Sequence, residues 1–355
     1  MVVAGFISVD CGLPGTANSV DDTTKLSYAP DAAFTDAGTS NNISAQYITA
    51  KLAKRYYNVR SFPDGARSCY TLRSLVAGLK YLVRAEFMYG NYDGLGRLPI
   101  FDLYVGVNFW STVNVTRPDA EVTLEAMVVV PEDVVQVCLV NTGSGTPFIS
   151  ALELRPLKSS IYPYVNATQA LVLFGRVNFG PADDTDTVRY PDDPYDRVWF
   201  PRMIDASTYA EISTTSRVLN ADKDLFEAPS KVMQTAITPR SNASNIEFYW
   251  DSMPLPMDPS PRYIIIMYFS ELQVLRSNAV REFYINLNGY MWFPEAYTPY
   301  YLATGQIYST SPSWGSDRYN VSINATAKST LPPIINAVEV FYIISTTNVG
   351  TDSQD

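Results

Sequence analysis

The chain of 355 residues contains no histidine. This absence excludes catalytic triads that depend on histidine, histidine zinc sites and imidazole-based pH switching. The only cysteines are Cys11, Cys69 and Cys138, and none lies in a C-x-x-C spacing, so a cysteine-rich metal site is excluded too. One disulfide with one free thiol and three buried thiols both remain open. We expect neither a metal nor a cofactor.

Charge and long apolar runs are also scarce. Charged residues make up 17% of the chain and the formal net charge is −10, which disfavours nucleic acid and anionic membrane surfaces as partners. No segment approaches the roughly 20 apolar residues needed to span a bilayer. The longest compact apolar run, 263–269, has the length of a buried strand. We expect membrane attachment only through a transmembrane segment absent from this chain.

What the chain has in quantity is aromatic and β-forming residues, and they repeat. The segments KYLVRAEFMY (80–89) and FDLYVGVNFW (101–110) have counterparts in RYIIIMYFSE (262–271) and FYINLNGYMW (283–292). The constant spacing predicts a duplicated unit. Four aromatic pairs lie 182 residues apart: Tyr81 and Tyr263, Phe87 and Phe269, Phe101 and Phe283, and Trp110 and Trp292.

Other matching segments lie at slightly different spacings. FISVDCG (6–12) matches FGRVNFG (174–180) at 168 residues, and ISALEL (149–154) matches INAVEV (335–340) at 186 residues. Changing spacings indicate insertions in loops, where a duplicated domain is expected to vary. Apolar residues alternate with polar ones in 101–107, which is typical of strands.

These patterns predict an all-β fold of two tandem β-sandwich domains with a jelly-roll-like arrangement. Proline and a glycosylation sequon interrupt the apolar rhythm between the two copies. The expected organisation is a first domain at 1–157, a linker at 158–170, a second domain at 171–345 and a polar tail at 346–355.

Six N-x-Ser/Thr sequons are spread along the chain, which favours passage through the secretory pathway. Their acceptor residues are Asn42, Asn114, Asn166, Asn242, Asn320 and Asn324.

Several long motifs point to a known family. They include GFISVDCGLP (5–14), RSFPDGARSCYTL (60–72), CLVNTGSGTPFISALELRPL (138–157) and RYPDDPYDRVWFP (189–201). Together they resemble the malectin-like ectodomain of plant leucine-rich-repeat receptor-like Ser/Thr kinases. The resemblance implies two tandem malectin-type β-sandwiches on the extracellular side of the plasma membrane. Leucine-rich repeats, a transmembrane helix and a kinase domain would follow the polar tail.

The loop after the first repeated strand is a candidate ligand site. It carries Tyr89, Asn91, Tyr92 and Asp93, and this position resembles the region where animal malectin gathers aromatics and an Asp around a glucose disaccharide. Sugar rings stack on tyrosine. The alternative is that Tyr89 and Tyr92 only pack the loop.

The segment 181–199 is unusually acidic. Its carboxylates could supply oxygen ligands to Ca²⁺, or they could cap turns and pair with Arg189 and Arg197. In the resembling family this segment is a framework signature, which favours the second interpretation. We nevertheless include Asp192, Asp193 and Tyr195 among the ligand-binding candidates. The acidic residues are Asp183, Asp184, Asp186, Asp192, Asp193 and Asp196.

The leading hypothesis is an extracellular ligand-sensing region of a receptor-like kinase. Its partners would be a secreted peptide, a co-receptor ectodomain, or a cell-wall or N-glycan oligosaccharide. The alternative is a carbohydrate-binding lectin module with no signalling role. A glycoside hydrolase would need two paired carboxylates, and nothing in the sequence pairs Glu86, Asp93, Asp102 or Asp193. We therefore expect this chain not to be an enzyme.

Overall fold

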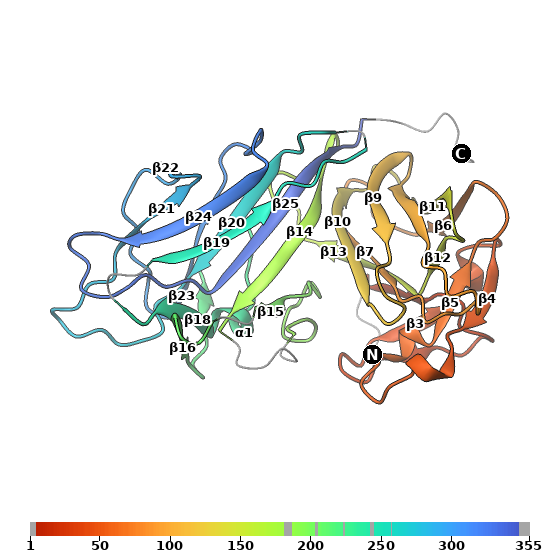
Figure 1. Ribbon diagram of the computed structural model, residues 1–355, viewed down its shortest axis with the longest axis horizontal. Helices are drawn as coiled ribbons and strands as arrows, with labels where there is room; N and C mark the ends of the chain where they lie inside the picture. The colour runs from red at the N-terminus through yellow and green to blue at the C-terminus, as the bar shows by residue number, and fades with distance from the viewer. Residues whose placement is uncertain are drawn as a thin grey trace. The chain divides into compact units, whose positions relative to one another are not determined.

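The computed structural model describes residues 5–180, 187–202, 205–222, 224–241, 245–256 and 258–347, and strands dominate them (Figure 1). The helices in these ranges are α1 (Ser230–Met233) and three single-turn 3-10 helices at Asp31–Ala33, Ala45–Tyr47 and Lys54–Tyr56. Within the same ranges, we find no helix long and apolar enough to cross a membrane. The predicted all-β fold is confirmed.

The chain divides into two compact units. Unit 1 comprises residues up to Val172 together with the residues from Ile344 onward, and unit 2 comprises Leu173–Ile343. The expected linker, 158–170, lies within unit 1, where Ile161 and Tyr162 are fully buried. The apolar side chains at these two positions therefore pack in a core. The domain boundaries expected from the sequence stay a prediction.

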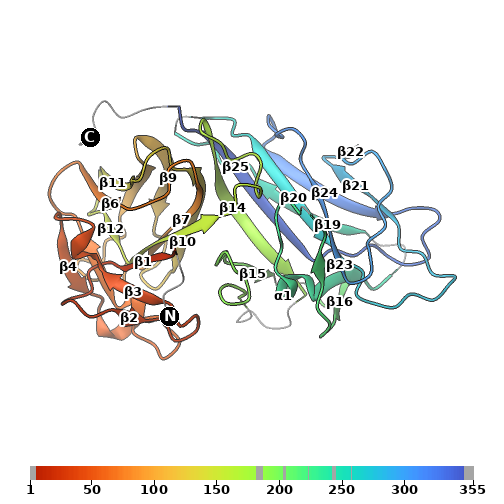
Figure 2. The same ribbon diagram turned by 180° about the vertical axis from the view of Figure 1, so that it is seen from behind.

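Unit 1 contains three sheets. The first runs in the order β10, β7, β13, β1, β3 and β2; the second in the order β6, β11, β8 and β9; the third in the order β12, β5 and β4. The pairings are antiparallel except for that of β1 with β3, and β1 to β3 are seen together in Figure 2. The strands are β1 (Ile7–Asp10), β2 (Ser19–Val20), β3 (Ser27–Pro30), β4 (Thr39–Asn42), β5 (Asn58–Ser61), β6 (Arg67–Leu72), β7 (Lys80–Phe87), β8 (Ile100–Val105), β9 (Asn108–Asn114), β10 (Val122–Val129), β11 (Val135–Ser144), β12 (Phe148–Ile149) and β13 (Ala151–Leu157).

Unit 2 repeats much of this order. One sheet runs β17, β23, β20, β25 and β14, with β15 beside β14; a second runs β19, β24, β21 and β22; β16 pairs with β18. The order β20–β25–β14 corresponds to β7–β13–β1 of unit 1, as the repeated segments predict. The strands are β14 (Gln169–Phe179), β15 (Phe200–Arg202), β16 (Tyr209–Ser213), β17 (Leu219–Asn220), β18 (Thr235–Pro239), β19 (Ile246–Asp251), β20 (Tyr263–Phe269), β21 (Phe283–Leu287), β22 (Tyr290–Met291), β23 (Ala303–Tyr308), β24 (Arg318–Ala325) and β25 (Ala337–Ser345).

Matching aromatic pairs join the two main sheets of each unit. In unit 1 the rings of Phe87 on β7 and Phe101 on β8 lie 5.7 Å apart, and in unit 2 the rings of Phe269 on β20 and Phe283 on β21 lie 5.3 Å apart. All four side chains are fully buried. Each unit is therefore a sandwich with its own core, and the same positions of the duplicated sequence build it.

Glycines at equivalent positions follow the first strand of each unit. Gly12 and Gly180 are 168 residues apart and have φ values of +85° and +99°. A Cβ on Gly12 would lie 2.3 Å from the carbonyl oxygen of Val59, and one on Gly180 would lie 2.7 Å from that of Ala236. Both positions need glycine because of the backbone conformation and because another strand passes close by.

Buried charges are the other shared feature. In unit 1 Arg84 lies directly opposite Glu125 and Glu153 on the two neighbouring strands, and it donates to both carboxylates. In unit 2 the equivalent of Glu153 is Glu339, which accepts a 2.6 Å hydrogen bond from Nε of Arg176. These side chains have at most 1% exposure. The glutamate is kept in both units, whereas its arginine partners come from β7 and β13 in unit 1 (Arg84 and Arg155) and from β14 in unit 2 (Arg176).

The register of β6 and β11 determines which cysteines form the disulfide. Cys69 and Cys138 are direct cross-strand partners and form a disulfide, while Cys11 is a buried free thiol. The sequence left this pairing open.

Candidate functional site

The predicted site around Tyr89 is a loop whose side chains and backbone bond to one another. The Tyr89 hydroxyl donates to Oδ1 of Asp93 and, at 3.2 Å, to Oδ1 of Asn91. Those two side chains also accept backbone N–H groups of the same loop, from Leu95 at 3.0 Å and Gly96 at 2.8 Å. Burial, followed by the neighbouring Asp93, raises the pKa of Tyr89 to about 12. The four predicted residues are therefore brought together.

The ring of Tyr89, however, belongs to the core, and that of Tyr92 is half-buried. Tyr89 is fully buried, and its ring lies 6.0 Å from that of Phe148 and 5.4 Å from that of Tyr92. Tyr92 in turn packs 5.4 Å from Phe148. A sugar cannot stack on a fully buried ring, so the geometry of Tyr89 corresponds to the loop-packing alternative. Asp93 is the exposed member of the group.

The second group of predicted residues, Asp192, Asp193 and Tyr195, forms part of a folded scaffold. Oδ2 of Asp193 accepts from Nε of Arg197 at 2.7 Å and from Nε1 of Trp199 at 2.8 Å. The Tyr195 hydroxyl donates to Glu227 at 2.6 Å. Asp193 is fully buried and Tyr195 is nearly so, whereas Asp192 is exposed.

The calcium alternative gains no support in the part of the segment that the structure describes. Asp196 is fully buried and pairs with Arg189 through two hydrogen bonds of 2.9 and 2.8 Å. Across the described residues, no three acidic or cysteine side chains gather in a way that could hold a metal ion. Asp183, Asp184 and Asp186 lie outside the described residues.

The carboxylates considered for hydrolysis are each engaged elsewhere. Glu86 pairs with Arg55, Asp102 accepts from Thr112 at 2.7 Å, and Asp93 and Asp193 make the contacts described above. Each of the four carboxylates is therefore bound by a partner within the fold.

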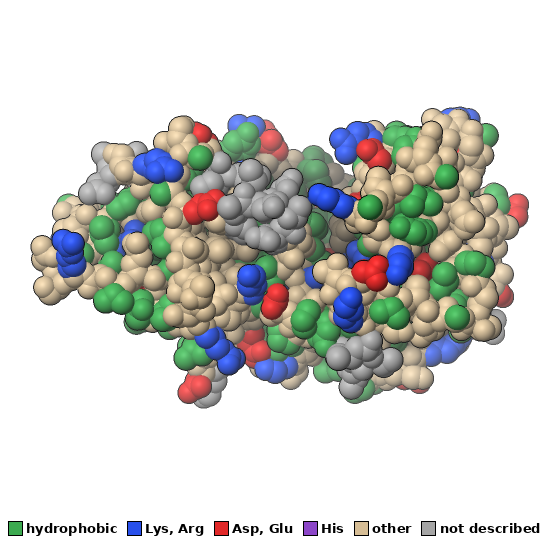
Figure 3. Space-filling view, turned by 90° about the horizontal axis from the view of Figure 1, so that it is seen from below, with side chains coloured by type: hydrophobic (Ala, Val, Ile, Leu, Met, Phe, Trp, Pro, Cys, Tyr) green, Lys and Arg blue, Asp and Glu red, His purple; other side chains and the backbone are tan. Residues whose placement is uncertain are grey.

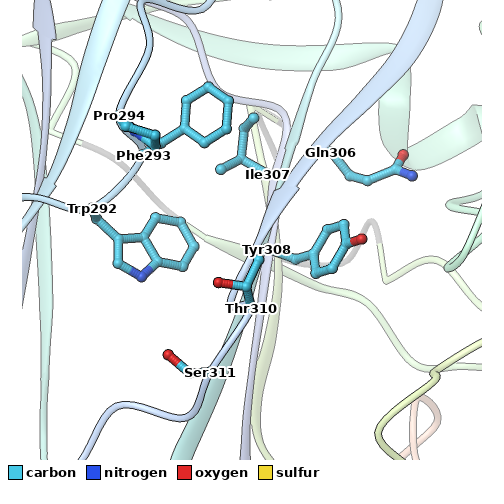
Figure 4. Close-up of a pocket in the computed structure, with 8 residues that line it drawn as sticks. All are labelled: Trp292, Phe293, Pro294, Gln306, Ile307, Tyr308, Thr310 and Ser311. Carbon is cyan, nitrogen blue, oxygen red and sulfur yellow. The ribbon is translucent and has the colours of Figure 1, made fainter.

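A pocket that the sequence did not predict lies in unit 2 (Figure 4). It has a volume of about 460 Å³ and is bounded by the segment after β22, by β23 and by the residues that follow β23. In Figure 4 the side chains of Trp292, Phe293 and Ile307 lie on one side of β23, while Gln306 and Tyr308 point to the other. The lining residues are Trp292, Phe293, Pro294, Gln306, Ile307, Tyr308, Thr310 and Ser311.

Backbone hydrogen bonds to β21 fix the segment that forms one wall of the pocket. The backbone N–H of Trp292 donates to the carbonyl of Ile285 at 2.9 Å, and Tyr297 exchanges backbone hydrogen bonds with Phe283 at 2.8 and 3.0 Å. Among the described residues that line the pocket, none is charged. Flat aromatic walls with the hydroxyls of Thr310 and Ser311 suit binding of a neutral ring or an apolar side chain and offer no acid or base.

Exposed aromatic side chains are confined to unit 2 within the described part of the chain. Trp314 is 69% exposed, Tyr300 68% and Tyr290 80%. Unit 1 buries or half-buries its described aromatics. The density of aromatic residues in 290–301 is a sequence signal that could have located part of this surface. The exposed set is Phe200, Tyr249, Tyr284, Tyr290, Tyr300, Tyr301 and Trp314.

The predicted glycosylation residues lie mainly at the surface. Asn42, Asn114, Asn166 and Asn320 are exposed and Asn324 is half-buried, while Asn242 lies outside the described residues. On the face shown in Figure 3, acidic and basic side chains are interspersed among uncharged ones.

Comparison with known proteins identifies the family. The malectin-like domain model matches residues 9–343. A leucine-rich-repeat receptor-like protein kinase of Arabidopsis thaliana is 39% identical over 355 residues, and a second receptor-like serine/threonine-protein kinase of that plant is 38% identical. Each match covers 99% of this chain but only 39% of the relative. The malectin-like match leaves no stretch of this chain for a kinase domain.

Solved structures share the fold. The ANX2 ectodomain of Arabidopsis thaliana superimposes with a TM-score of 0.74 at 17% identity, covering 97% of this chain and 98% of that one. A structure of the peptide RALF23 in complex with FER and LLG2 matches with a TM-score of 0.70 at 15% identity, covering 96% and 95%. The fold, the full-length family match and the level of identity to the kinases agree with the sequence motifs, and the chain therefore belongs to the malectin-like domain family of plant receptor-like kinases.

Proposed function

We propose that this chain is the extracellular ligand-sensing part of a plasma-membrane receptor-like Ser/Thr kinase, and that unit 2 binds a secreted peptide or a partner ectodomain. The observation that carries the proposal is the confinement of exposed aromatic side chains to unit 2 among the described residues. Tyr and Trp are enriched at protein interfaces and dominate binding energy there. Solvent-exposed aromatics such as Trp314 and Tyr300 gain most from being covered.

The relatives support the same class of function. They are named as receptor-like kinases, and this chain spans 39% of their length. A protein of the same fold, FER, has been crystallised with the peptide RALF23 and with LLG2. Binding of a peptide and a second protein is thus compatible with this fold, and the aromatic surface of unit 2 supplies the kind of side chains that such binding uses.

The test is capture from apoplastic fluid followed by direct titration. The tagged chain should retain a secreted peptide or another ectodomain, identified by mass spectrometry and then measured with synthetic or purified ligand. We expect the double variant Tyr300→Ala/Trp314→Ala to weaken binding at least about tenfold. Leu95→Ala is the matched control, because Leu95 is equally exposed at 66% but lies in unit 1.

Two outcomes count against the proposal in different ways. Equal retention by the double variant and the control would place the binding surface elsewhere. Recovery of no peptide or ectodomain from several tissues would contradict the sensing function itself.

A second candidate, glycan binding without a signalling role, is favoured by the pocket at Trp292. An uncharged pocket with an indole wall and two hydroxyls suits a sugar ring. Titration with glucose oligomers and pectin fragments should then quench tryptophan fluorescence, and Trp292→Ala should abolish the change. Absence of any change at millimolar sugar would remove this candidate.

A further inference from the structure

The sheet β19–β24–β21–β22 has a buried face and an outer face. On β19 the burial pattern alternates strictly, with Ile246, Phe248 and Trp250 buried and the residues between them exposed. On β24, Tyr319, Val321 and Ile323 are buried. Because successive side chains of a strand point to opposite faces, the even-numbered residues of β24 belong to the outer face. These include both sequon residues of this strand, Asn320 and Asn324.

The strand register places an aromatic residue opposite each of these asparagines. Asn320 is the direct partner of Tyr249 on β19, and Asn324 is the direct partner of Tyr284 on β21. The backbone N–H and C=O of Asn320 bond to Asn288, on the side away from β19. Asn320 and Tyr249 therefore form a non-hydrogen-bonded pair, in which facing side chains approach most closely.

Tyr249 is held in position while remaining accessible. The guanidinium of Arg318 lies 4.2 Å from the centre of its ring, and Arg318 is itself fixed by hydrogen bonds of 2.6 and 3.3 Å to Asp251. Tyr249 nevertheless stays 54% exposed. The arginine covers one face of the ring, and the 54% exposure means that much of the rest of the side chain is open to solvent.

The other strand sequons lack this arrangement. Asn42 on β4 lies opposite Asn58, and Asn114 on β9 lies opposite Ile100. Both are exposed. They serve as internal controls, because they share the strand context and the accessibility of Asn320 but have no aromatic partner.

We propose that Asn320 carries an N-linked glycan whose first N-acetylglucosamine packs on the free face of Tyr249, and that Asn324 with Tyr284 forms a second, weaker copy of this site. The two glycans would cover the outer face of this sheet and direct partners to other surfaces of unit 2. This inference rests on the secretory route that the proposed function implies, and goes beyond it in assigning a modification and a sugar-contacting residue.

The chemistry is that of glycan transfer from a lipid-linked oligosaccharide pyrophosphate. Nδ2 of Asn320 forms a bond to C1 of the first sugar, the bond from C1 to the pyrophosphate oxygen breaks, and one amide proton is released with the lipid pyrophosphate. The apolar C–H face of the attached sugar then meets the aromatic ring, as in other contacts of tyrosine with apolar groups.

The experiment uses the whole chain secreted from plant or insect cells, with occupancy at each sequon read from glycopeptide mass spectra. We expect Asn320 to be occupied. After trimming to one N-acetylglucosamine per site, wild type should have a Tm higher than Asn320→Gln by about 2–4 °C. Tyr249→Ala should abolish that difference and Tyr249→Phe should keep it. In wild type, ring-current shifts of the sugar protons report the contact without any substitution.

Three results would overturn the inference: an unoccupied Asn320, an unchanged glycan-dependent Tm difference in Tyr249→Ala, or sugar protons without ring-current shifts. Glycan occupancy at Asn42 and Asn114 distinguishes failure of this inference from failure of the proposed function. If they are modified and Asn320 is not, only the inference falls; if the native chain carries no glycan at all, the secretory placement falls with it.

Discussion

Replacing Glu339 by alanine tests the buried charge of unit 2. The side chains of Glu339 and Arg176 both have 0% exposure, and Nε of Arg176 lies 2.6 Å from one carboxylate oxygen. The other oxygen accepts from the Tyr268 hydroxyl, also at 2.6 Å. Glu339→Ala therefore removes a carboxylate partner of a buried guanidinium and an acceptor of a buried hydroxyl.

The expected loss is large for this reason. Breaking a buried ion pair by removing one partner costs about 3–5 kcal/mol, out of the roughly 5–15 kcal/mol that stabilise a whole domain. An exposed pair of the same chemistry provides the control. Arg318 and Asp251 are 51% and 60% exposed, so Asp251→Ala should cost less than about 1 kcal/mol.

Urea unfolding, followed by circular dichroism and tryptophan fluorescence, measures both variants. The transition assigned to unit 2 should shift in Glu339→Ala, and the double variant Arg176→Met/Glu339→Leu should recover most of the loss, because no unpaired charge remains buried. The reasoning is refuted if Glu339→Ala is no more destabilising than Asp251→Ala. The same holds if the double variant loses as much unfolding free energy as Arg176→Met and Glu339→Leu lose when their separate losses are added.

Three further predictions follow from unit cores and turns. Removing the disulfide in Cys69→Ser/Cys138→Ser, which opens a connection between residues 69 apart, should lower the unfolding free energy by about 4 kcal/mol, and reduction of wild type should reproduce that loss. Burial raises the pKa of Asp10 from 3.8 to about 6, so the folded state binds a proton more tightly than the unfolded state. The unfolding free energy should therefore fall by up to about 3 kcal/mol as pH rises from about 4 to above 6. Asp10→Asn should remove this pH dependence in urea titrations, and an unchanged pH profile would contradict the prediction. Gly12→Ala and Gly180→Ala should each destabilise their unit by at least about 1–3 kcal/mol in thermal unfolding, and tolerance at either position would show that the neighbouring strand can yield.

The sequence itself determined the repeated architecture. Apolar runs of strand length, such as 263–269, became fully buried strands, since a segment apolar on both faces must be covered on both. The constant spacing of Phe87 and Phe269 predicted equivalent core positions, and both rings occupy them. These features depend on the local hydrophobic pattern and on the duplication of the segments, both of which can be read directly from the sequence.

The exposure of individual aromatic side chains, in contrast, depends on contacts between segments that are far apart in the sequence. Trp110 and Trp292 are equivalent in the repeat, yet Trp110 is fully buried in β9 whereas Trp292 follows the short β22 and lines a pocket. Likewise Tyr89 lies on a loop, where exposure is expected, but Phe148 from β12 packs against it and makes it core. Periodicity shows which way a side chain points, whereas its exposure depends on what covers that side.

The same holds for charge and covalent pairing. The repeat preserved Glu153 and Glu339 but gave no indication that their arginines come from different strands. The pairing of Cys69 with Cys138, and of Asn320 with Tyr249, is a consequence of strand register. Register is set by long-range packing of whole sheets, so composition and spacing determined the kind of protein, and the tertiary structure decided which of its residues meet.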